Sequence, residues 1–258
     1  MLPRLRAVFE PPSGMGRMVL SSYRSVFHSL IKGAIQRHSS DLYRHYFSTD
    51  HPIIKPYTFA ILFSKARANA EQDIIKFQRA TFLFSTISHE WLVALTNALH
   101  ALQTSHLITS HGPLLLRGMR IEPQQAIQTN AVTFRTLSPV LIRSAQNPRH
   151  YLLPRCTNFP GDDAFVASLM ENLRQVTNAL SNDQEFLTDE VNDLVFKPIN
   201  LQRTIIKYQK NATIIKMPAF RGTFRLFAAP SLLNFIANVG LGSRRSQGFG
   251  MVEHIAQH

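Results

Sequence analysis

Residues 240–253 read GLGSRRSQGFGMVE, a run in which two Gly-x-Gly pairs enclose two neighbouring arginines. Residues 230–239, just before it, are apolar at helical spacing, and residues 249–255 have the pattern of a strand. The sequence therefore predicts a helix, a glycine-rich loop and a strand in that order.

This loop also has the composition of a phosphate-binding segment. Glycine lets backbone amides approach a phosphate closely, and arginine presents a fork of donors to it. The Gly-Lys-Ser/Thr sequence of a nucleotide-binding P-loop is missing. We therefore expect a nucleic-acid backbone to bind here, with a turn that carries solvated arginines as the alternative. The residues concerned are Gly240, Gly242, Arg244, Arg245, Gly248 and Gly250.

The two halves of the chain repeat one order of elements. In the first half we predict strands at 4–10, 57–63, 74–85 and 114–121, and helices from residue 21, at 41–47 and at 88–102. In the second half we predict strands at 131–143, 151–153, 223–228 and 249–255, a hairpin over 205–217, and helices at 162–180 and 230–239. This order predicts an α+β protein of two tandem ferredoxin-like (RRM-like, βαββαβ) domains, residues 1–126 and 127–258.

Composition and charge indicate a globular protein with a polyanionic partner. Of the 258 residues 45% are hydrophobic and 17% charged, and 28 basic against 16 acidic residues give a net charge of +12. The basic residues are spread along the chain, which favours a cleft built by folding. The single cysteine, Cys156, fits a reducing cytoplasm. The chain shows no apolar run of about 18 residues and no signal-peptide segment at its start, so we expect a cytoplasmic protein without a membrane partner.

Three segments together resemble one family along nearly the whole chain. They are Lys55-Pro56-Tyr57-Thr58-Phe59-Ala60, Thr136-Leu137-Ser138-Pro139-Val140 and the glycine-rich run. Their order and spacing resemble the CRISPR-associated endoribonucleases that process repeat RNA, the Cas six (Cas6) family of the RAMP proteins. The resemblance implies metal-independent cleavage of CRISPR repeat RNA without a cofactor. It also leaves other Cas effector subunits and a second copy of the chain as candidate partners. The alternative is a non-catalytic subunit that binds repeat RNA.

The chemistry that the resemblance implies is attack of a ribose 2′-OH on the adjacent phosphorus. Histidine suits the proton transfers, and lysine or arginine the charge of the transition state. In the family the histidine commonly lies shortly before the strand that here begins after Lys55, which makes His45, His51 and Lys55 the candidate catalytic residues. His45 stands ten residues before Lys55 and His51 four, and the choice between them is open. His28 and His38 are further candidates, because some members place the histidine earlier.

The predicted hairpin supplies a second candidate RNA-binding surface. The aromatic motif with which RRM domains stack bases is absent from the sequence. Basic residues instead follow one another along residues 203–216, and a solvated hairpin would explain them almost as well. The candidates are Arg203, Lys207 and Lys210, with Lys216 beside them.

Overall fold

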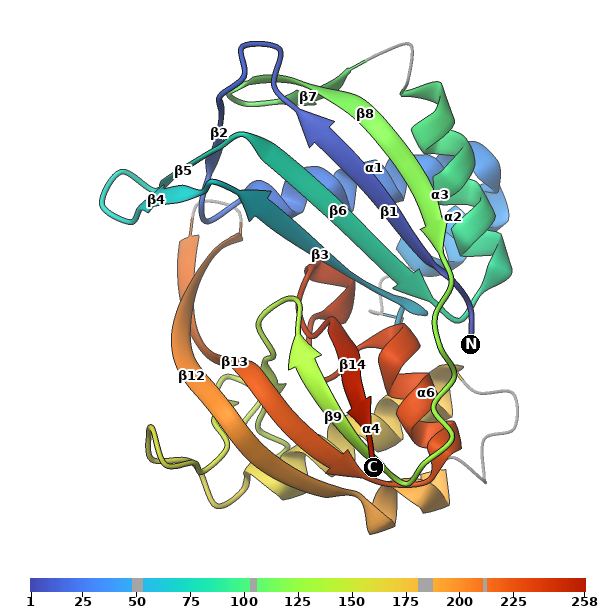
Figure 1. The fold of residues 1–258 in the computed structure, drawn as a ribbon, viewed down its shortest axis with the longest axis vertical. Helices are drawn as coiled ribbons and strands as arrows, with labels where there is room; N and C mark the ends of the chain where they lie inside the picture. Colours follow the sequence, from blue (N-terminus) through green and yellow to red (C-terminus); the bar gives the residue numbers. More distant parts are fainter. Residues whose placement is uncertain (48–52, 103–105, 181–187, 211–212) are drawn as a thin grey trace.

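The computed structural model describes residues 1–47, 53–102, 106–180, 188–210 and 213–258. They form two domains, one above the other in Figure 1, each with an antiparallel sheet and helices packed on it. None of the helices in these ranges is long and apolar enough to span a membrane.

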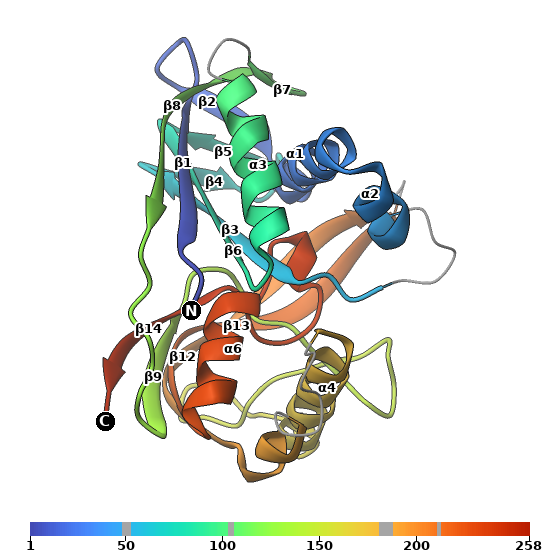
Figure 2. The same cartoon turned by 90° about the vertical axis from the view of Figure 1, so that its right-hand side faces the viewer.

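The N-terminal domain is built on a five-stranded sheet with the order β3-β6-β1-β8-β7. Helices α1 and α3 cover one face of this sheet, and α2 follows α1 (Figure 2). Amphipathic spacing explains α1, since its buried residues recur at positions 27, 30, 31, 34 and 35. The elements are β1 (Arg4–Glu10), α1 (Tyr23–His38), α2 (Ser40–Phe47), β3 (Tyr57–Ser64), β6 (Arg79–Thr86), α3 (His89–Ala101), β7 (Leu107–Thr109) and β8 (Gly112–Glu122).

The C-terminal domain is built on a four-stranded sheet with the order β12-β13-β9-β14. Strands β12 and β13 form a long hairpin that reaches toward the N-terminal domain (Figure 1). A short two-stranded sheet, β10-β11, lies outside the main sheet. The elements are β9 (Ala131–Thr136), β10 (Ile142–Arg143), β11 (Tyr151–Leu152), α4 (Phe165–Leu180), β12 (Val195–Lys210), β13 (Thr213–Phe227), α6 (Pro230–Val239) and β14 (Val252–Gln257), with the 3-10 turns η1 (Val191–Asp193) and η2 (Arg245–Gln247).

The two main sheets share one topology. In chain order, strands one to four are β1, β3, β6 and β8 in the N-terminal sheet, and β9, β12, β13 and β14 in the C-terminal sheet. In both sheets these strands lie side by side in the order two-three-one-four. A helix separates the first strand from the second and the third from the fourth in each domain. This is the βαββαβ ferredoxin-like arrangement, so the predicted fold class is confirmed.

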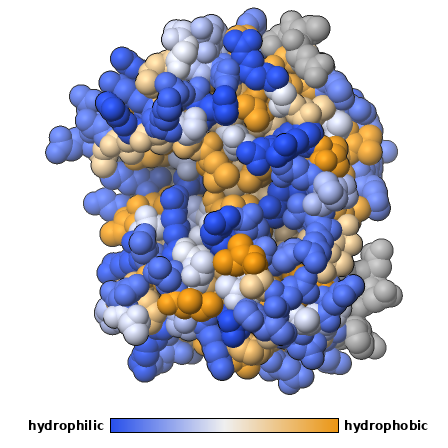
Figure 3. Space-filling model, viewed as in Figure 1, coloured by the Kyte–Doolittle hydropathy of each residue, from blue (hydrophilic) through white to orange (hydrophobic). Residues whose placement is uncertain are grey.

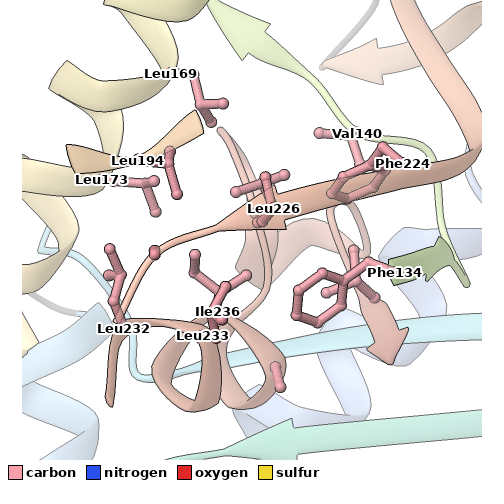
Figure 4. Packing of buried hydrophobic residues seen from close by; sticks show 14 of the residues in the cluster. Phe134, Val140, Leu169, Leu173, Leu194, Phe224, Leu226, Leu232, Leu233 and Ile236 are labelled. Atoms are coloured by element: carbon pink, nitrogen blue, oxygen red, sulfur yellow. The ribbon is translucent and has the colours of Figure 1, made fainter. Parts of the chain in front are cut away.

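Each domain has its own hydrophobic core. The N-terminal core draws its buried residues from positions 5–114, and the C-terminal core from positions 127–252. Figure 4 shows the C-terminal core, where Phe134 and Phe224 of the sheet meet Leu233 and Ile236 of α6. The two cores fit a division near residue 126, although the boundary itself stays a prediction.

The structure divides two segments that the sequence presented as single strands. The 74–85 segment is split at Gln78, so that β5 (Ile74–Phe77) joins a separate sheet with β2 (Gly16–Val19) and β4 (Arg67–Asn69). The 131–143 segment ends as a strand at Thr136, because the backbone amides of Leu137 and Ser138 both donate to the carbonyl of Met251. The hairpin predicted at 205–217 is longer, since its paired strands run from residue 195 to residue 227.

Candidate functional site at the junction of the two domains

The glycine-rich loop packs between the two domains. Its backbone closes on itself where Leu241 N donates to Gly250 O at 2.8 Å. Gly240 and Gly248 have φ of +82° and +84°, a left-handed backbone that favours glycine. A Cβ on Gly248 would lie 2.7 Å from the Phe59 ring, and one on Gly240 would lie 2.9 Å from Thr58 Oγ1. The absence of side chains therefore lets the loop lie directly on β3.

The three segments that carry the family resemblance meet at this junction. Thr58 Oγ1, fully buried in β3, donates to Phe249 O at 3.1 Å. From the Ser-Pro segment, Ser138 Oγ accepts from Met251 N at 2.9 Å, and Pro139 O accepts from Gly250 N at 2.8 Å. The three segments thus form one hydrogen-bonded unit, although about 80 residues separate the first from the second and about 110 the second from the third.

Two buried arginines of the N-terminal domain also hold the loop and the strand that follows it. Arg24 Nε donates to Gly248 O at 3.2 Å, and its guanidinium lies 4.6 Å from the centre of the Phe249 ring. Arg4 Nη2 donates to Val252 O at 3.1 Å, and burial lowers the pKa of Arg4. Sequence reasoning missed both residues, since nothing local marks an arginine that faces another domain.

A cavity of about 420 Å³ opens beside this junction. Its walls come from residues 53–55 before β3, from residues 143–148, from α4 and from residues 242–246 of the loop. In Figure 2, α4 and the segment that leads into β3 lie toward the right-hand side of the molecule. The described residues that line it include four basic ones, Lys55, Arg143, Arg244 and Arg245, and one acidic one, Glu171. We call this cavity the junction pocket.

One tyrosine brings two of these cations together. The Tyr151 hydroxyl accepts from Arg244 Nε at 2.7 Å and from Arg143 Nη2 at 3.3 Å. Arg244 has φ of +57°, and its Nη1 also donates to Gln247 Oε1 at 2.9 Å. One hydroxyl thus holds the guanidinium groups of Arg143 and Arg244 together on the part of the pocket wall that the C-terminal domain contributes.

The two adjacent arginines of the loop have different surroundings. Arg245 is only 6% exposed, and its Nη1 donates to Val239 O at 3.0 Å within its own domain. Burial lowers the pKa of Arg245 to about 10. Both arginines line the pocket, but Arg244 is half-buried whereas Arg245 is almost fully buried, so Arg244 is the better placed of the two to reach a ligand.

Lys55, on the opposite wall, lies beside residues of α1 and α2. Its Nζ is 5.0 Å from the centre of the Phe47 ring. Burial and the charge of Lys32 lower the pKa of Lys55. His28 and Lys32 are one turn apart on α1, and this spacing places both on one face of the helix. Their common face could have been predicted from the sequence. Burial and the charges of Lys55 and Lys32 lower the pKa of His28 to about 4.

The structure does not bring His45 to this pocket. His45 is exposed on α2, with its ring edge-on to that of Tyr46 at 4.6 Å. It is not among the residues that line the junction pocket. His51 lies outside the described residues.

The hairpin candidates lie away from the junction pocket. Arg203 is exposed on β12, and Lys207 Nζ donates to Ala70 O of the N-terminal domain at 3.0 Å. For Lys210 the structure describes the backbone alone, paired with Thr213. The face seen in Figure 3 is dominated by hydrophilic side chains.

Comparisons with known proteins agree with this fold. Among curated protein sequences no match is found. Among solved structures, a RAMP protein binding different RNA substrates has a TM-score of 0.77 and 14% identity, covering 98% of this chain and 100% of that one. A Cas6-related protein from Pyrococcus furiosus has a TM-score of 0.73 and 16% identity, with 100% of both chains covered. A Cas6 product complex from Thermus thermophilus has a TM-score of 0.69 and 15% identity, covering 99% of this chain and 100% of that one.

The chain thus has the fold of these proteins, with two tandem ferredoxin-like domains. The family model described as CRISPR associated protein Cas6, C-terminal, matches residues 121–254, just over half of the chain. The chain therefore belongs to the Cas6 family.

Proposed function

We propose that this protein is an endoribonuclease that cleaves CRISPR repeat RNA in the cytoplasm without a metal ion. The observation that carries the proposal is the junction pocket, where Lys55 of one domain faces Arg143 and Arg244 of the other. A surface with this excess of positive charge suits a phosphate backbone. Membership of the Cas6 family supports repeat RNA as the substrate, and one of the solved structures with this fold is a Cas6 product complex.

The proposed reaction needs no cofactor. The ribose 2′ oxygen forms a bond to phosphorus while the bond from phosphorus to the 5′ oxygen breaks, which leaves a 2′,3′-cyclic phosphate and a 5′-OH. A base takes the proton of the 2′-OH, and an acid gives a proton to the leaving 5′ oxygen. In our proposal Lys55 and Arg244 stabilise the negative charge that grows on the phosphorane oxygens.

His28 remains a candidate for a proton transfer beside His45 and His51. Like His45, it does not line the junction pocket, but its ring lies 6.1 Å from the ring of Phe47, which Lys55 of the pocket also contacts. With a pKa of about 4 its imidazole is neutral at pH 7 and has a nitrogen able to accept a proton. A bound phosphate would oppose the effect of Lys32 and Lys55, because a negative charge favours the imidazolium form. Substrate would therefore raise the pKa of His28 toward the value that suits general acid–base catalysis.

RNA binding outside the pocket is part of the proposal. The basic side chains of the hairpin belong to the candidate binding surface. Arg203, Lys207 and Lys210 would extend that surface along β12. Of the loop glycines Gly240, Gly242, Gly248 and Gly250, only Gly242 lines the pocket, and the amides of the other three already donate to carbonyls of the protein. In our proposal these glycines therefore shape the loop beside the RNA.

Cleavage assays with the repeat RNA of the protein's own genome test the proposal. We expect full cleavage in EDTA and a cyclic phosphate on the product. Activity that disappears on chelation and returns with magnesium would refute the metal-independent mechanism. RNA binding without cleavage would favour a non-catalytic subunit.

A set of histidine variants then identifies the residue that transfers a proton. His28→Ala, His45→Ala and His51→Ala are compared in single-turnover cleavage, with His100→Ala, exposed near the end of α3, as the matched control. Loss of a general acid or base slows cleavage by about 10²–10⁴-fold with little change in RNA affinity. If all three variants cut at the wild-type rate, no histidine of this group carries the reaction.

A further inference from the structure

The ring of Phe47 lies at the centre of a cluster of cationic and aromatic groups. Lys55 Nζ is 5.0 Å and Lys32 Nζ 5.8 Å from the ring centre, and the His28 ring lies 6.1 Å from it. The Tyr43 ring is 5.6 Å away on the same helix as Phe47. The cluster thus joins α1, the end of α2 and the segment that leads into β3.

The two lysines of this cluster have no acidic partner in the described part of the chain. Neither Lys32 nor Lys55 forms an ion pair with a described carboxylate, whereas nine other basic groups of the protein do. Each of the two is half-buried, and the charge of Lys32 lowers the pKa of Lys55. Like charges held together in a half-buried place destabilise one another, and an anion between them removes that cost.

The aromatic ring explains how the two cations are held near each other. An ammonium group within about 6 Å of a ring centre is attracted by the negative face of the ring. Phe47 offers this attraction to Lys32 and Lys55 alike. It cannot neutralise them, as a carboxylate would, so their charge stays available to a ligand.

We propose that Lys32 and Lys55 together bind one phosphate group of the RNA and that Phe47 is the residue that positions them. The inference rests on the proposed function and adds two residues to it. Lys32 contacts the phosphate, whereas Phe47 acts only through the lysines. A phosphate suits this place because its several oxygens can accept from two ammonium groups at once, and each lysine supplies a compact charge with three donors.

His28 provides a readout that does not depend on cleavage. Because its ring belongs to the cluster, an anion bound between the lysines raises its pKa. We would follow the His28 ring protons by NMR across a pH titration, in inorganic phosphate and in chloride of equal ionic strength. In the wild-type protein we expect phosphate to raise the pKa of His28. The response should disappear in the Lys32→Gln/Lys55→Gln double variant and be kept in Lys76→Gln, which removes an exposed lysine of β5.

Single variants separate the two roles. Lys32→Arg should keep the response of His28 to phosphate, and Phe47→Leu, which retains an apolar side chain, should weaken it while both lysines are present. Circular dichroism of every variant confirms that the fold is intact. A response to phosphate that is the same in the double variant as in the wild type would overturn the proposal, and so would a wild-type protein without any response.

Cleavage of the repeat RNA distinguishes an RNA phosphate from free phosphate as the ligand. Lys32→Gln should slow single-turnover cleavage by about 10²-fold, the usual effect of removing one group that stabilises a charged transition state. Cleavage by Lys32→Gln at the wild-type rate would refute the RNA phosphate as the ligand. If the wild-type protein does not cleave, the proposed function fails, yet the NMR titration still decides whether the lysine pair binds an anion.

Discussion

The hydrogen bond from Thr58 to the glycine-rich loop gives a direct test of how the two domains are joined. Thr58→Val keeps the shape of the side chain but replaces the hydroxyl that donates to Phe249 O at 3.1 Å. Thr58 is fully buried, so water cannot take the place of the lost donor. Removing one partner of a buried hydrogen bond costs about 1–3 kcal/mol. We expect the free energy of unfolding to fall by this amount, which lowers the melting temperature by about 2–12 °C for a chain of this size.

The residue opposite Thr58 provides the matched control. Ser85 of β6 pairs with Thr58 across the sheet and is 1% exposed, and its hydroxyl has no hydrogen-bond partner among the described residues. Ser85→Ala therefore removes a buried hydroxyl without breaking a bond, and we expect no loss of stability. Thermal unfolding by circular dichroism and hydrogen exchange of the amides in residues 248–252 measure the two effects. If Thr58→Val melts with the wild type, or if Ser85→Ala loses as much, the bond does not hold the domains together.

Backbone geometry, titration and surface charge each give one further prediction. Gly248→Ala should lower the free energy of unfolding by about 1–3 kcal/mol because φ there is +84°. Gly33→Ala on α1, where an added Cβ would meet open space, should raise the free energy of unfolding by up to about 1 kcal/mol. Thermal melts measure both changes. The free energy of unfolding of the wild type should fall as the pH drops from about 6.5 to about 4, because His28 binds a proton in this window in the unfolded chain and not in the folded one. In His28→Gln, the free energy of unfolding measured with urea should depend less on pH over the same window. Arg244→Gln should reduce the slope of log affinity for repeat RNA against log salt by about 0.7–0.9, and buried Arg245→Met should leave it unchanged, in filter-binding titrations.

The order of helices and strands could be predicted from the sequence because the spacing of apolar residues within one short segment is enough to indicate its type. Apolar spacing in residues 230–239 and alternation in residues 4–10 fix a helix and a strand without knowledge of their partners. The break at Gln78 could not be predicted in this way. It depends on β2, about sixty residues earlier, which pairs with β5 and draws it out of the main sheet.

The site was predictable in part for a similar reason. Lys55 and the loop glycines belong to recognisable short segments. Arg143 is held at the pocket by Tyr151, and the two meet only because β10 pairs with β11. Arg244 and Arg245 look equivalent as neighbours in the sequence. Their different surroundings come from the left-handed backbone at Arg244, which no composition rule reveals.

Three of the hydrogen bonds that join the domains at this loop end on its backbone, although Leu241, Phe249 and Met251 of the loop are fully buried. Thr58, Arg24 and Arg4 donate to carbonyl oxygens of residues 248–252, and every amino acid carries a carbonyl. These bonds therefore depend on the three donors and on the glycines that allow close approach, and not on the identity of the residue whose carbonyl accepts. Chains that share only 14–16% of their residues with this one can thus retain the same two-domain architecture.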